Sequence, residues 1–167
     1  NLYIRIIIDP ESPIGKSDPA NISDIFLESA LSTILDCEDS VATVDTKDKI
    51  HAYRNWLSLM KGDLETQFNK NGKIIIRKLN SDIEYLSLSG KKNYLKGRSL
   101  MLIRNVGHLM TSKSIIDNKG SEVGEGIMDA MITSVISLHD FTKDLRNKNS
   151  QYNSIYIVKP KMHGPEE

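Results

Sequence analysis

The stretch Thr33–Val41, "TILDCEDSV", indicates a strand of a parallel sheet, and its short run of apolar and β-branched residues ends abruptly in three acids. The run is apolar on both faces, as expected for a parallel strand that helices cover. Neighbouring carboxylates repel one another and lose hydration when they are partly buried. We therefore expect a cation, an arginine or a metal ion from outside this stretch to compensate the acids.

Two later stretches have the same design: "SLMLIRNVGH" (Ser99–His108) and "SIYIVKPKMHG" (Ser154–Gly164). Each is a short apolar run with its polar cluster at the carboxyl end, and a (β/α)₈ barrel builds its active site at that end of its strands. If the three runs are neighbouring parallel strands, Arg104 would neutralise the acids, alone or together with a metal ion. The polar residues that would then share one rim are Asp36, Glu38, Arg104, His108, Lys159 and Lys161.

The rest of the chain predicts helices and antiparallel strands. Helical spacing of apolar residues predicts helices over 21–32, 44–62 and 125–145. The second would be capped by Asp45 or Thr46 and ended by Gly62. The third would have an apolar side formed by Ile127, Met131, Val135, Leu138 and Leu145.

Runs rich in β-branched residues predict strands at 3–9, 72–79 and 83–88. The last two are joined by a turn-like "NSD" and, with 93–97, suggest a small antiparallel sheet. We interpret the antiparallel strands as an insertion into the barrel. The predicted fold is therefore α/β, with strands of a partial TIM (β/α)₈ barrel and an inserted small α/β domain.

Composition excludes several classes of protein. The 167 residues suffice for one domain, and 22 basic residues balance 22 acidic ones, which gives no indication of nucleic-acid binding. A single cysteine excludes an internal disulfide and favours a reducing, cytoplasmic compartment. No apolar run approaches the roughly 20 residues of a membrane span. The chain opens at Asn1 directly before a strand, which predicts a piece of a longer protein.

Each polar cluster has a structural as well as a functional interpretation. "DCED" is either a helix-capping loop with solvated charges or a site for a metal or for proton transfer. Asp36 and Glu38 point the same way in an extended strand, a pair that suits Mg²⁺ and its waters better than Zn²⁺. Arg104 either pairs with a carboxylate at the edge of the core or grips an oxyanion or a substrate carboxylate.

Other reactive residues carry weaker signals. Cys37, His108 and His163 do not have the spacing of a zinc module, and a thiol flanked by acids is hard to ionise. "IGKS" (Ile14–Ser17) imitates the end of a phosphate-binding loop, but Pro10 stands where that motif needs glycine. We therefore predict neither a zinc site nor a nucleotide-binding loop of this type.

Long blocks of the chain together resemble the malate synthases in their long, G form. The resemblance covers nearly the whole chain in the correct order. The blocks are "ESPIGK", "LESALSTILDCEDSVATVD", "YRNWLSLMKGDL", "GRSLMLIRNVGHLMT", "EGIMDAMITS" and "SIYIVKPKMHGPEE".

The resemblance implies a magnesium-dependent condensation of acetyl-CoA with glyoxylate, followed by hydrolysis of malyl-CoA to malate and CoA in the glyoxylate bypass. It implies a TIM barrel that carries an inserted α/β domain. Residues 1–32 would belong to that insertion and its junction, 33–43 to a barrel strand, 44–97 to the insertion, and 98–167 to barrel strands and a helix.

The resemblance also implies roles for particular residues. Arg104 would be the catalytic arginine, which binds glyoxylate and stabilises negative charge on the enolate and alkoxide oxygens. Asp36 and Glu38 would be acids beside the metal that hold its waters or Arg104. Ser40 and Arg77 would contact acetyl-CoA.

The family's two direct magnesium ligands and its catalytic base match no residue of this chain, so we expect the 167 residues alone to be inactive. Open sheet edges would be covered by the rest of a parent chain or by a partner chain. Two alternatives stay open: a related magnesium-dependent lyase or aldolase acting on CoA thioesters, and a non-catalytic folding module.

Overall fold

The structure, a computed structural model, describes residues 2–28, 32–38 and 43–166. These residues separate into two compact units, Asn1–Leu31 and Ser32–Glu167. We describe the two units one after the other.

The first unit is a β-hairpin. β1 (Tyr3–Ile8) pairs antiparallel with β2 (Ile22–Glu28), and a 3₁₀ turn at Gly15–Ser17 lies in the connection between them. The predicted helix over 21–32 is therefore wrong for its described part. Its apolar residues pair across the hairpin, with Ile25 opposite Ile6, so strand pairing overrides a spacing that also fits a helix.

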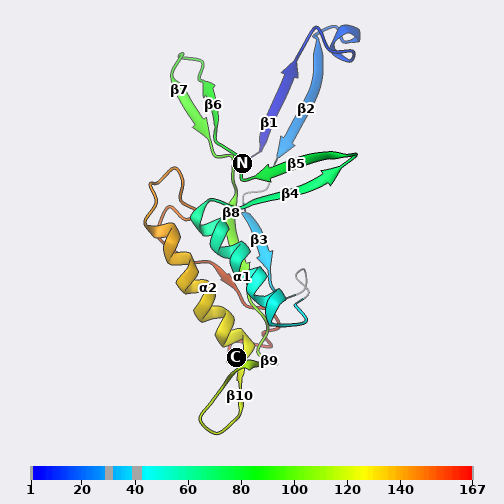
Figure 1. Ribbon diagram of the computed structural model, residues 1–167. Helices are drawn as coiled ribbons and strands as arrows, with labels where there is room; N and C mark the ends of the chain where they lie inside the picture. Colours follow the sequence, from blue (N-terminus) through cyan, green and yellow to red (C-terminus); the bar gives the residue numbers. More distant parts are fainter. Residues whose placement is uncertain (1, 29–31, 39–42, 167) are drawn as a thin grey trace. The chain divides into compact units, whose positions relative to one another are not determined.

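A three-stranded parallel sheet is the centre of the second unit (Figure 1). Its order is β11 (Ile157–Val158), β8 (Leu100–Arg104) and β3 (Ser32–Asp36). Both outer strands run parallel to β8, and Asp36 lies opposite Arg104 in the register. The prediction that the three similar stretches form neighbouring parallel strands is confirmed.

Two helices lie side by side in the second unit (Figure 1). α1 (Thr46–Lys61) is capped at its start by Asp45, whose side chain accepts a hydrogen bond from the backbone N–H of Asp48. Gly62, in the left-handed conformation, caps its end. This confirms the predicted cap and end of α1. α2 (Glu125–Phe141) runs in the same direction as α1, because the contacts advance along both helices together, from Lys49 with Glu125 to Trp56 with Thr133.

The core lies between the sheet and the helices. Trp56 and Met60 of α1 pack against Ile103 of β8 and Cys37, all of them at most 3% exposed. The indole Nε1–H of Trp56 donates to the backbone oxygen of Thr133 in α2, at 3.1 Å. Because Ile103 faces the helices, Arg104 projects from the opposite face of the sheet.

The predicted apolar face of α2 is not its buried face. The predicted apolar side is 51 to 67% exposed, and it consists of Ile127, Met131, Val135, Leu138 and, beyond the helix end, Leu145. The face that packs inward carries Met128 together with the polar residues Asp129, Thr133, Ser137 and Asp140. These polar groups are buried because hydrogen bonds and ion pairs satisfy them.

Three hairpins complete the second unit: β4–β5 (Glu65–Lys70, Lys73–Lys78), β6–β7 (Ile83–Leu86, Lys92–Leu95) and β9–β10 (Thr111–Ile116, Glu122–Gly124). The predicted antiparallel strands exist, but the expected pairing of β5 with β6 is wrong. β5 pairs with β4 and β6 pairs with β7, because the tight turn at Asn71 and Gly72, both with positive φ, closes a hairpin before β6 begins.

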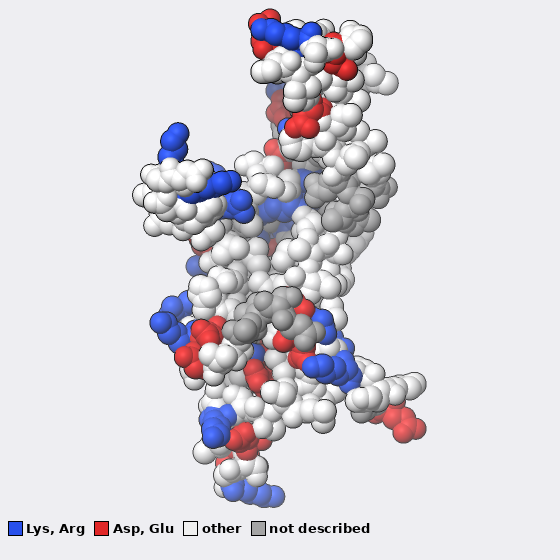
Figure 2. Space-filling model, turned by 90° about the vertical axis from the view of Figure 1, so that its right-hand side faces the viewer, with Lys and Arg blue, Asp and Glu red and all other residues white. Residues whose placement is uncertain are grey.

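Charges of both signs are interspersed on the surface. Figure 2 shows Lys and Arg side chains near Asp and Glu side chains, among many uncharged residues. This distribution agrees with the formal net charge of zero. In the parts of the chain that the structure describes, neither helix is long and apolar enough to cross a membrane.

Candidate functional site

The carboxyl ends of β3, β8 and β11, called the rim below, bring an arginine to an acid. The guanidinium Nη1 of Arg104 lies 3.2 Å from Oδ2 of Asp36, and the two side chains are 27% and 14% exposed. The other carboxylate oxygen of Asp36 accepts the backbone N–H of Glu38 at 2.9 Å. The register of β3 and β8 produces this pair, because it places the two residues directly opposite each other.

Glu38 is held from two further segments of the rim. One oxygen accepts the backbone N–H of Gly107 at 2.8 Å, and the other forms an ion pair with Lys161. The carboxylate is only 4% exposed. The hydrogen bond from Lys161 outweighs the effect of burial and lowers the pKa of Glu38. Glu38 is therefore a carboxylate at neutral pH and ties β3 to the segments after β8 and β11.

The other predicted rim residues lie at the same strand ends. Lys159 donates from Nζ to the backbone oxygen of Val106. His108 is exposed, and its Nε2 lies 2.9 Å from the sulfur of Met162. His163 is exposed on the segment after β11. These contacts link the segments that follow β8 and β11.

Of the two residues expected to contact acetyl-CoA, Arg77 is not part of this cluster. Arg77 lies in β5 opposite Thr66, and its guanidinium carbon is 5.1 Å from the centre of the Phe68 ring. Ser40 lies outside the described residues. Their predicted roles stay predictions.

Cys37 lies between Asp36, the last residue of β3, and Glu38, but it faces the core. It is 3% exposed, and burial raises the pKa of its thiol to about 11, with the nearby carboxylate of Asp129 acting in the same direction. The thiol is therefore protonated at neutral pH. This agrees with the expectation that the Cys37 thiol is hard to ionise.

We predict that Cys37 reacts slowly with thiol reagents in the folded protein. At pH 8 the thiolate fraction is small and the sulfur is shielded from solvent, so alkylation by iodoacetamide should be at least about tenfold slower than in urea. Mass spectrometry after timed quenching measures both rates. Equal rates with and without urea would contradict the buried, protonated state.

The residues that the structure describes do not form a magnesium site by themselves. Among them, no group of three or more His, Cys, Asp and Glu residues is placed to hold a metal ion. Both oxygens of Asp36 and both oxygens of Glu38 accept hydrogen bonds or ion pairs from the protein. The two acids fit a role beside a hydrated ion better than direct coordination.

Sequence reasoning missed a buried polar cluster directly behind the rim. It is called the support cluster and consists of Lys49 and Tyr53 of α1 and Glu125 and Asp129 of α2. Asp129 is fully buried and accepts the backbone N–H of Val106, which follows the strand end that carries Arg104. One signal in the sequence could have indicated this cluster: Asp129 is the single acid within the otherwise uncharged run "GIMDAMITSVISLH". An acid buried there would need a partner, because an unpaired buried charge is costly.

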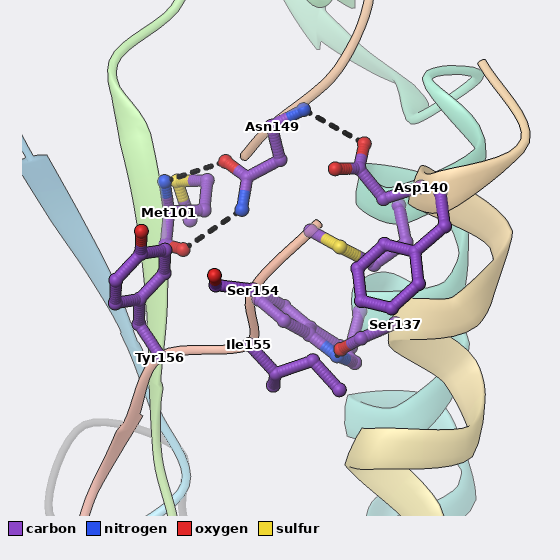
Figure 3. Close-up of a pocket in the computed structure, with 10 residues that line it drawn as sticks. Met101, Ser137, Asp140, Asn149, Ser154, Ile155 and Tyr156 are labelled. Atoms are coloured by element: carbon purple, nitrogen blue, oxygen red, sulfur yellow. Dashed lines mark hydrogen bonds between the residues drawn. The ribbon is translucent and has the colours of Figure 1, made fainter. Parts of the chain in front are cut away.

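A small cavity lies at the opposite, amino-terminal end of the parallel strands (Figure 3). Its volume of about 10 Å³ is close to that of one water position. The side-chain amide of Asn149 pairs there with both the N–H and the C=O of Met101, at 2.7 and 3.0 Å. Asp140 in turn accepts the backbone N–H of Asn149. These polar groups satisfy one another, so we interpret this cavity as structural.

Comparisons with known proteins agree with this architecture. Residues 100–167 match the family model "Malate synthase, TIM barrel domain". The parallel strands β8 and β11 and the helix α2 fall within the residues that this family model matches.

The whole chain is also similar to malate synthase G from three bacteria. The identity is 56% to the protein of Halalkalibacterium halodurans, and 50% to those of Corynebacterium glutamicum and Corynebacterium efficiens, each over 99% of this chain. The chain belongs to the malate synthase family. It spans 22 to 23% of the length of these relatives.

Proposed function

We propose that this chain is a segment of a malate synthase, an acyltransferase that condenses acetyl-CoA with glyoxylate and hydrolyses malyl-CoA to malate and CoA. The proposal is supported by the identity of 50 to 56% to malate synthase G along the chain. The single structural observation that carries it is the pairing of Arg104 with Asp36 at the carboxyl end of the parallel strands. The full-length protein that would contain this segment is called the parent enzyme below.

In this proposal Arg104 is the electrophilic residue. Removing a proton from the methyl group of a thioester places negative charge on an oxygen, and a fixed guanidinium beside that oxygen stabilises it. The planar fork of Arg104 also suits the carboxylate of glyoxylate. Asp36 accepts from one arm of the fork, at 3.2 Å, and so orients it.

Glu38 has a positioning role in this proposal. It links the segment after β3 to Gly107 and Lys161, and so fixes the distances between the three strand ends. Magnesium, which the family resemblance implies, would take its direct ligands from residues other than the described ones. Ser40 and Arg77 are proposed to contact acetyl-CoA.

The domain arrangement is proposed on the same basis. Residues 33–43 and 98–167 would supply strands and a helix of the barrel, and 1–32 and 44–97 would belong to an inserted α/β domain and its junctions. The rest of the parent enzyme would cover the free edges of β3 and β11 and the exposed stripe of α2. The enzyme would work in the cytoplasm.

We expect the 167 residues alone to form no malate, because the proposed electrophile would act without a catalytic base. Release of free CoA from acetyl-CoA and glyoxylate measures the reaction for the chain and for the parent enzyme. Malate formation by the chain at even a few per cent of the parent rate would contradict this expectation.

The same assay separates the alternatives. A related lyase would cleave malyl-CoA but would give no net malate from acetyl-CoA and glyoxylate. A parent protein that shows neither reaction and no heat of binding with either substrate would refute the proposed function and favour a folding module.

A further inference from the structure

Asp129 of the support cluster lies in α2, is fully buried, and accepts from α1 and from the segment that follows β8. Its Oδ1 accepts the phenol O–H of Tyr53 at 2.6 Å and lies 2.7 Å from Nζ of Lys49. Its Oδ2 accepts the backbone N–H of Val106 at 3.0 Å. One side chain therefore connects α1 and α2 to the segment that follows β8.

The buried ammonium of Lys49 requires a carboxylate at position 129. Lys49 lies 2.7 Å from both Glu125 and Asp129, and its side chain is only 10% exposed. Burial alone would lower the pKa of Lys49, but hydrogen bonds to the two carboxylates outweigh it and raise that pKa. Tyr53 stays neutral, because burial and the bond to Asp129 raise the pKa of its phenol. A buried ammonium thus faces two acids, and loss of either acid leaves it less compensated.

Asp129 holds the backbone segment that directly follows Arg104. Val106 is fixed through its N–H by Asp129 and through its oxygen by Lys159. The next residue, Gly107, donates its N–H to Glu38. The backbone after Arg104 is therefore held by hydrogen bonds from two sides: Asp129 bonds it from α2, and Lys159 and Glu38 bond it from the rim.

We propose that Asp129 is a positioning residue for Arg104: by fixing the peptide at Val106, it sets the direction in which the guanidinium meets Asp36 and the substrate. This inference rests on the proposed malate synthase function. It assigns a specific role to the buried acid of α2, which touches neither Arg104 nor the substrate.

The substitution Asp129→Asn tests this inference in the parent enzyme. The substitution keeps the shape of the side chain but leaves only one accepting oxygen. That oxygen cannot serve both Val106 on one side and Tyr53 and Lys49 on the other, so the amide NH₂ must face one of these donors. We expect kcat to fall about 10- to 100-fold, as for partners that orient a reactive group, with little change in KM for acetyl-CoA.

Asp140→Asn is a matched control at the other end of the same helix. Asp140 is 2% exposed, accepts the backbone N–H groups of Asn149 and Ser150, and pairs with Lys143. It resembles Asp129 in burial and in partners, but it lies at the amino-terminal end of the strands. Asp140→Asn should lower the melting temperature as Asp129→Asn does and leave kcat unchanged.

Amide hydrogen exchange at Val106 and Gly107 gives a readout that does not depend on activity. Asp129→Asn should accelerate exchange there beyond any global change, and Asp140→Asn should not. Unchanged exchange at these two amides, or an equal loss of kcat in both variants, would overturn the inference. A wild-type parent that forms no malate would refute the proposed function, while local exchange would still decide whether Asp129 fixes this segment.

Discussion

Arg104→Met in the parent enzyme is expected to lower kcat for malate formation by about 10²- to 10³-fold, the loss typical of removing one donor from a developing oxyanion. The substitution keeps the aliphatic stem but removes the charge that faces Asp36 across the rim. Arg104→Lys should recover only part of the rate, because a single ammonium replaces the charge but not the planar fork. Initial rates at saturating acetyl-CoA and varied glyoxylate measure both variants.

Arg54→Met provides the control for this prediction, because Arg54 is an exposed residue of α1, a helix that the core separates from the Arg104 face of the sheet. It should keep the rate of the wild type. If Arg104→Met retained kcat within a factor of about three, which corresponds to less than 1 kcal/mol of transition-state stabilisation, the assignment of Arg104 as the electrophile would be wrong.

Gly126→Ala is expected to destabilise the protein by about 2–3 kcal/mol, because it forces a methyl group into a closely packed contact. A Cβ at Gly126 would lie 2.1 Å from Nζ of Lys159 and 2.7 Å from the backbone oxygen of Val106. The lysine side chain can move, but the backbone of Val106 is held by Asp129. The start of α2 must therefore retreat from the rim, which also disturbs the Lys159–Val106 hydrogen bond.

Gly124→Ala is the matched control two residues earlier. The nearest atom to its added Cβ is in the Ile127 side chain, at 3.7 Å, which is an ordinary contact, and its φ of −55° suits alanine. At an N-cap, alanine in place of glycine should cost less than about 1 kcal/mol. Thermal and urea unfolding of both variants measure the difference, and equal stabilities would contradict the close contact at Gly126.

The convergence of Arg104 and Asp36 could be predicted from the sequence, because three separate stretches share a strand pattern with polar carboxyl ends. Parallel strands bring their carboxyl ends to one edge whatever their separation along the chain. The cap at Asp45 and the end at Gly62 were also predictable, because both depend on local backbone chemistry.

The remaining features depend on contacts that local patterns do not encode. Residues 22–28 fit a helix by spacing, but pairing with β1 makes them a strand. In α2 an apolar stripe is exposed and Asp129 is buried, because partners far away in sequence, Lys49 and Tyr53, satisfy the acid. A hydrophobic pattern cannot reveal such a satisfied charge.

The amide of Asn149 has a consequence for the opposite end of the sheet. β11 contains two residues, too few for its own ladder to exclude a slip by one position. The side-chain amide of Asn149 bonds both backbone groups of Met101, as a neighbouring strand would. It therefore fixes the segment that leads into β11 beside the start of β8. A slip of one residue would turn Lys159 to the other face of the sheet. Asn149 thus adds a second attachment to β8 for the segment that carries Lys159 to the rim.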